Sequence, residues 1–109
     1  MADPKGYILA ELAVTDAAYF HGEYMPRVRP VLDKYGAKFL IATDDPEVLE
    51  GDRVVKRVVF IEFESLARAQ EFYHSKDYQD VIGYRFRSAQ SHLYMMGGVA
   101  DQAAAPRSS

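Results

Sequence analysis

The sequence contains no cysteine. Disulfide bonds, thiolate catalysis and cysteine-rich metal sites are therefore excluded. No apolar run comes close to the roughly 18 residues that a membrane-spanning helix needs. Residues 1–5 also lack the apolar segment of a secretory signal. From these absences we expect a cytoplasmic protein with no membrane partner.

Basic clusters and metal-binding motifs are also scarce. The chain has 13 Lys and Arg against 16 Asp and Glu, and its longest basic cluster, residues 53–57, fits an alternating strand. Nucleic-acid binding requires a basic patch, so we expect no nucleic-acid partner. The histidines His21, His74 and His92 lack the spacing of metal-binding motifs. We therefore expect no metal site.

The length and composition are those of one globular domain. A chain of 109 residues that is 49% hydrophobic and 27% charged fits a single domain and argues against overall disorder. We expect this domain to occupy residues 1–99. The tail, residues 100–109, consists of Ala, Pro, Ser and polar residues without periodicity, and we expect it to be disordered.

Hydrophobic periodicity predicts the order β-α-β-β-α-β. Alternation predicts a strand over residues 7–14, and a run dense in Val, Ile and Phe predicts the strongest strand over 53–63. Two further strands are expected over 37–43 and 90–96. Helical spacing predicts helices over 16–35 and 65–74, and a shorter helix is expected over 78–87. This is the α+β ferredoxin-like fold, with an antiparallel sheet in the order 4-1-3-2. Pro26 and Pro30 each remove a backbone donor, so we expect a kink or break near Met25.

Both faces of the predicted sheet are apolar. Ile8, Ala10 and Leu12 make one face of the first strand, which suits packing under helices. The opposite face carries Tyr7, Leu9 and Phe60 and is too apolar to meet water. A second copy in twofold symmetry is the simplest cover for such a patch. We therefore expect a homodimer whose two sheets pack into a shared barrel.

Several short motifs, taken in order and spacing, resemble a known family. They are Lys5-Gly6-Tyr7, Val14-Thr15-Asp16, residues 35–40, residues 48–52, Val58–Phe63 and Phe72-Tyr73-His74-Ser75. Across roughly residues 5–99 the chain resembles the small bacterial family called domain of unknown function thirteen-thirty, in the dimeric α/β-barrel superfamily. The resemblance implies the ferredoxin-like fold and the dimer, and it leaves the chemistry open.

The same resemblance bears on cofactors. Some members of the superfamily bind haem through an axial histidine on the helical segment that follows the second main helix. The matching position here is Ile82, and an isoleucine side chain cannot ligate iron. We expect neither haem nor another cofactor.

The candidate catalytic residues are Glu62, Tyr24 and Arg85. Glu62 lies in the apolar run 58–63, where an unpaired buried charge is costly. It is either a structural carboxylate paired with a base such as Arg85, or an acid/base or ligand-orienting group. Arg85 suits pairing with Glu62 or bidentate binding of a substrate carboxylate. We expect Glu62 to line one cavity with Tyr24, Tyr73 and Arg85.

Two classes of function stay open from the sequence. One is a mostly apolar pocket that binds or converts a small organic molecule without metal or haem. The other is a non-catalytic dimeric structural or accessory module whose polar core groups only fix the packing. The residues expected to bind a ligand are Tyr7, Tyr24, Phe60, Glu62, Tyr73, Arg85 and His92.

Overall fold

The computed structural model describes residues 4–99, so the tail at 100–109 lies outside the described residues. Its four antiparallel strands form one sheet in the order β2-β3-β1-β4, which confirms the predicted order 4-1-3-2. The strands are β1 (Gly6–Val14), β2 (Lys38–Thr43), β3 (Arg57–Phe63) and β4 (Ala89–Gly97). The helices are α1 (Ala17–Tyr19), η1 (Phe20–Tyr24), α2 (Met25–Lys34), α3 (Leu66–His74), α4 (Lys76–Gln79) and α5 (Ile82–Ser88). The fold is α+β and ferredoxin-like, as expected.

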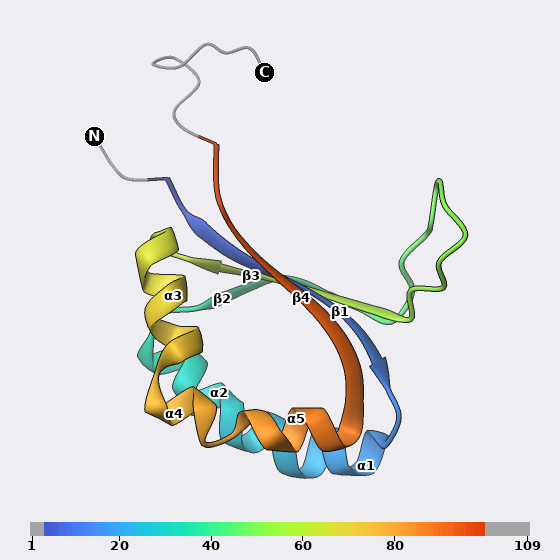
Figure 1. Ribbon diagram of the computed structural model, residues 1–109, viewed down its shortest axis with the longest axis horizontal. Coiled ribbons are helices and arrows are strands. Elements are labelled where there is room, and N and C mark those ends of the chain that lie inside the picture. Colours follow the sequence, from blue (N-terminus) through green and yellow to red (C-terminus); the bar gives the residue numbers. More distant parts are fainter. Residues whose placement is uncertain (1–3, 100–109) are drawn as a thin grey trace.

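All the helices lie on one side of the sheet (Figure 1). Alternating residues of the strands face them, including Ile8, Ala10 and Leu12 of β1 and Ile61 and Phe63 of β3. These side chains are at most 9% exposed, because the helices cover them. The hydrophobic core therefore lies between the sheet and the helices. No helix within residues 4–99 is long and apolar enough to cross a lipid bilayer.

Strand β3 is shorter than expected from its composition. It begins at Arg57, whereas the sequence suggested a start at Arg53. The neighbouring strands explain the difference, because Thr43 at the end of β2 pairs with Val58 and Leu12 of β1 pairs with Arg57. The pairing of β1 with β3 stops at this register, although β1 itself continues to Val14 beside β4. Residues 53–56 therefore pair with neither neighbour and belong to the connection between β2 and β3.

The two prolines change the first helix without breaking it. The helical segments α1, η1 and α2 follow one another directly, and η1 is a π-helical turn that ends next to the expected break at Met25. The Met25 N–H donates to the Phe20 carbonyl, five residues back. Pro26 has no backbone N–H and so cannot donate a hydrogen bond to the preceding turn. It lies in the first turn of α2, where a missing N–H donor is tolerated. The expected kink is therefore a widened turn.

The face of the sheet opposite the helices, called the open face below, is uncovered in the single chain (Figure 1). At its centre Leu9 lies opposite Phe60 on one side and Tyr94 on the other. The Tyr7 ring stacks on the Phe60 ring with centroids 5.0 Å apart. Tyr94 is 44% exposed. The apolar second face that the sequence predicted is present, and nothing within residues 4–99 covers it.

Candidate functional site

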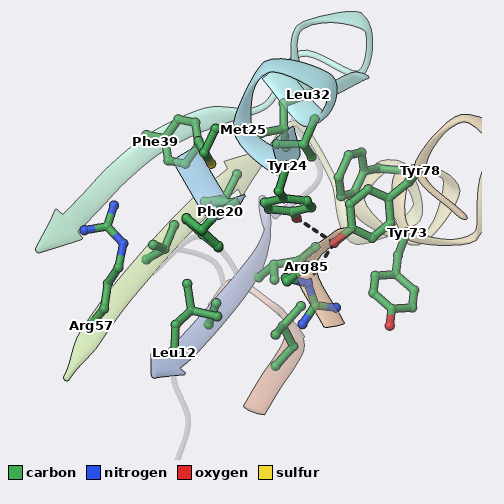
Figure 2. Close-up of a pocket in the computed structure, with 17 residues that line it drawn as sticks. Leu12, Phe20, Tyr24, Met25, Leu32, Phe39, Arg57, Tyr73, Tyr78 and Arg85 are labelled. Atoms are coloured by element: carbon green, nitrogen blue, oxygen red, sulfur yellow. Dashed lines mark hydrogen bonds between the residues drawn. The ribbon is translucent and has the colours of Figure 1, made fainter. Parts of the chain in front are cut away.

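A cavity of about 70 Å³ lies between the helices and the sheet. Its walls are mostly apolar and include Leu12 of β1, Phe20 of η1 and Leu32 of α2 (Figure 2). A single water needs about 10–15 Å³, so the cavity accepts a few waters or a small organic group. Phe39 of β2 also lines it and is 41% exposed, so this side chain can move outward for a larger ligand.

One end of the cavity is polar, and Arg85 of α5 is its centre. Arg85 is only 5% exposed. Its Nε donates to the Tyr78 hydroxyl at 3.2 Å and its Nη1 donates to Ser91 Oγ at 2.5 Å. The Tyr78 and Tyr24 hydroxyl oxygens are 2.9 Å apart and share a hydrogen bond (Figure 2). Tyr73 of α3 lies beside them, with its ring centroid 5.5 Å from that of Tyr78.

Hydrogen-bond donors outnumber acceptors at this end. A guanidinium group only donates, so the Tyr24 and Tyr78 oxygens are the acceptors available within this group of three side chains. The hydroxyl hydrogen of one tyrosine forms the hydrogen bond between Tyr24 and Tyr78. The hydroxyl hydrogen of the other tyrosine has no acceptor among these three side chains. None of the ion pairs formed within residues 4–99 includes Arg85. The site therefore presents a buried positive charge and a spare hydroxyl donor.

The pKa shifts keep these groups in their donor forms. Burial raises the pKa of the Tyr24 phenol far above its ordinary range, and the adjacent Tyr78 hydroxyl raises it further. Burial lowers the pKa of the Arg85 guanidinium, but the surrounding tyrosine hydroxyls raise it by more. Tyr24 is therefore a neutral phenol and Arg85 a cation at physiological pH. The described residues that line the cavity include no Asp, Glu, His or Lys, so the walls offer no general base.

A second arginine, Arg57, lines the cavity from the start of β3. Its Nη1 donates to Asp44 Oδ1 at 2.8 Å. Its Nε is buried and has no hydrogen-bond partner, which is true of no other buried side-chain nitrogen or oxygen within residues 4–99. Sequence reasoning missed this residue. The signal was available, because Arg57 has the same strand parity as Val59 and Ile61, which face the helices.

Residues 5–99 match the family described as Domain of unknown function (DUF1330). The chain belongs to this family. The resemblance seen in the sequence is thereby confirmed. Among curated proteins no match was found.

Solved structures similar to this DUF1330 chain share its fold. The protein of unknown function RPA0582 from Rhodopseudomonas palustris has a TM-score of 0.70 at 19% identity, over 91% of this chain and 85% of that one. SnoaB, a cofactor-independent oxygenase from Streptomyces nogalater, has a TM-score of 0.59 at 12% identity, over 92% and 97%. An uncharacterized NIPSNAP domain protein from Burkholderia xenovorans has a TM-score of 0.55 at 10% identity, over 88% and 95%. These neighbours are dimeric α/β-barrel proteins.

The structure divides the ligand-binding residues predicted for this DUF1330 chain between the two faces of its sheet. Tyr24, Tyr73 and Arg85 line the cavity together. Glu62 does not, and the expectation that it shares a cavity with them or pairs with Arg85 was wrong. Ile61 on the strand faces the helices, so its neighbour Glu62 points to the open face. There its carboxylate accepts a hydrogen bond from the Tyr7 hydroxyl at 3.2 Å.

Tyr7, Phe60 and His92 also lie on the open face of this DUF1330 chain, away from the cavity. Burial and the hydrogen bond to Glu62 raise the pKa of Tyr7. His92 is exposed and lies opposite Glu11 of the neighbouring strand. Ligand binding by these open-face residues stays a prediction. Within residues 4–99, no three side chains of His, Asp or Glu lie together as a metal site requires.

Proposed function

We propose that this DUF1330 protein binds a small organic acid, as its anion, in the cavity between the helices and the sheet. The observation that carries the proposal is Arg85, a buried guanidinium that forms no ion pair within residues 4–99. Buried charges are normally paired, so an unpaired one on a cavity wall favours an anionic ligand. A planar guanidinium suits the two oxygens of a carboxylate, and it also suits a phenolate or enolate oxygen.

The composition of the cavity walls favours a ligand that arrives already ionised. A proton cannot pass to the walls, because Tyr24 holds its own proton and no carboxylate, imidazole or amine lines the cavity among the described residues. The charge on Arg85 stabilises the anion over the neutral acid and so lowers the pKa of the bound ligand. The apolar walls contact the rest of the molecule.

An organic anion held in this way also matches the class of reaction described for one neighbour. SnoaB is a cofactor-independent oxygenase, at 12% identity to this chain. An oxygenase without a cofactor must take electrons from its substrate, and an anion is a better electron donor than its neutral acid. Oxygen uptake in the presence of a bound acid distinguishes an enzyme of this class from a binding protein.

Replacing Arg85 should remove most of the affinity for acids. We expect Arg85→Met to weaken the binding of benzoate about 10- to 100-fold, because hydrogen bonds to a charged group are worth about 1.5–3 kcal/mol. Isothermal titration calorimetry measures this. Arg87→Met is the matched control, since Arg87 lies on the same helix and is exposed, and we expect it to bind benzoate as the unchanged protein does.

Two outcomes contradict the proposal. One is equal benzoate affinity in the unchanged protein and in folded Arg85→Met. The other is a broad panel of carboxylic acids, phenols and fatty acids that gives no saturable binding, which would favour the view that Arg85 and the tyrosines only fix the packing. If Arg85→Met does not fold, Arg85→Lys keeps the charge but loses the planar donor pair, and we expect it to bind benzoate more weakly than the unchanged protein.

The pH dependence of binding should follow the ligand and not the protein. Between about pH 5 and pH 9, Arg85 stays charged and Tyr24 stays neutral, since both pKa values are raised from ordinary values that already lie above this range. Benzoate is ionised throughout, so its affinity should be constant. A nitrophenol that ionises near neutrality should lose affinity about tenfold per pH unit below its own pKa. A benzoate affinity that changes across this range would show a titrating protein group in the site.

A further inference from the structure

The cavity has a second polar feature, the unpaired Nε of Arg57. Buried polar groups nearly always have a hydrogen-bond partner, so an exception on a cavity wall points to an acceptor that a ligand brings. The rest of the guanidinium is accounted for, because Nη1 donates to Asp44 at 2.8 Å. The Arg57 side chain is 18% exposed and that of Asp44 is 79% exposed, so the carboxylate approaches the guanidinium from the solvent side.

The strand register places Arg57 across the cavity from Arg85. Leu12 of β1 pairs with Arg57 on one side and with Ser91 on the other, so the three residues form one row across the sheet. Ser91 accepts the hydrogen bond from Arg85. Adjacent strands lie about 4.8 Å apart, so the two ends of this row are about 10 Å apart. Figure 2 shows the two arginines on opposite sides of the apolar residues Leu12 and Phe20.

We propose that Arg57 is a second anchor in this cavity, and that the ligand is an organic acid with a neutral oxygen acceptor on the far side of a short apolar body. This inference rests on the proposed binding of an acid at Arg85. The second group is neutral because Asp44 already balances the charge of Arg57. A carbonyl or ether oxygen meets this requirement. The cavity of about 70 Å³ is smaller than the roughly 150 Å³ that holds a benzene ring, so an apolar body of one ring requires the half-exposed Phe39 side chain to move outward.

The test compares two acids of the same shape. 4-Acetylbenzoate carries a carbonyl acceptor opposite its carboxylate, and 4-isopropylbenzoate carries none. We expect the unchanged protein to prefer the acetyl acid about tenfold, the effect of one hydrogen bond from a charged donor. In Arg57→Met the preference should vanish, because the side chain no longer offers a donor at this end of the cavity. Arg53→Met, at an exposed arginine in the preceding loop, should keep the preference.

A second variant separates the role of Nε from that of the charge. Arg57→Lys keeps a cation for Asp44 but has no Nε donor, so it too should lose the preference. Thermal melts establish that each variant is folded. Equal affinity of the unchanged protein for both acids, or a preference that survives in folded Arg57→Lys and Arg57→Met, overturns the role of Arg57 while binding at Arg85 stands. If neither of these acids nor benzoate binds, the proposed function itself has failed.

Discussion

Phe60→Glu is expected to turn a dimer into a monomer. We propose that the open face packs against a second copy of the chain, as the dimeric α/β-barrel neighbours suggest. Phe60 lies beside Leu9 and stacks on Tyr7 at the centre of this face. A carboxylate there would be buried without a partner, which costs about 3–5 kcal/mol per copy. In sedimentation equilibrium at micromolar concentration, we expect the unchanged protein to be a dimer and Phe60→Glu a monomer.

The control for this experiment is Phe86→Glu. Phe86 lies on α5, on the helical side of the sheet, and is 62% exposed. The same chemical change there places the carboxylate at the surface, beside the Arg85 guanidinium that lies 5.0 Å from the Phe86 ring, and should leave the dimer intact. A monomer in the unchanged protein, or a dimer in Phe60→Glu, contradicts the proposed interface. Circular dichroism shows whether the Phe60 variant keeps its secondary structure, so that dissociation is distinguished from unfolding.

The connection between β2 and β3 adds to the case for a partner on the open face. It extends from the sheet away from the helices (Figure 1). Leu49 and Val54 in this connection are 84% and 81% exposed. Near the end of this connection, Arg53 forms an ion pair with Glu11 on the open face. The exposed side chains of Leu49 and Val54 would therefore extend a dimer interface that is centred on Leu9 and Phe60 of the open face.

The sequence was informative where a single periodicity decides the structure. Alternation in β1 correctly separates Ile8 and Leu12, which face the helices, from Tyr7 and Leu9, which face away. The strand β3 was predicted from its density of Val, Ile and Phe, and the sheet order followed from the ferredoxin-like pattern. The boundary at Arg53 was wrong because strand propensity describes one segment alone, whereas a strand also needs paired neighbours, and the pairings of β3 end at Arg57 and Val58.

The candidate site was harder to predict for a different reason. Glu62 was predicted to line the cavity because its neighbours are apolar, whereas strand parity places Ile61 toward the helices and Glu62 away from them. The same parity would have identified Arg57. The bonds from Arg85 to Tyr78 and Ser91 depend on how α5 packs over the end of β4. No local pattern in the sequence predicts how α5 packs against β4.

Gly6→Ala is expected to destabilise the fold, because β1 touches the start of α3 at this glycine. A Cβ atom at Gly6 would lie 2.4 Å from the Ser65 carbonyl oxygen and 2.6 Å from the Leu66 Cα. Both are backbone atoms, so no side-chain rotation relieves the overlap. Ser65 also caps α3, since its Oγ accepts from the Arg68 N–H at 3.1 Å. Overpacking costs about 1–3 kcal/mol, and for a backbone overlap we expect about 3 kcal/mol.

Urea unfolding of Gly6→Ala and Gly83→Ala at one protein concentration tests this contact. Gly83 lies in α5, and an added Cβ would have no atom within 4 Å apart from its chain neighbours and the backbone of its own helix, so alanine there should stabilise the protein by about 0.5–1 kcal/mol. A Gly6→Ala variant as stable as the unchanged protein would mean that α3 does not rest on β1. The contact matters for ligand binding because α3 carries Phe72 and Tyr73 of the cavity wall. A shift of α3 away from Gly6 should therefore weaken benzoate binding as well, whereas Gly83→Ala should not.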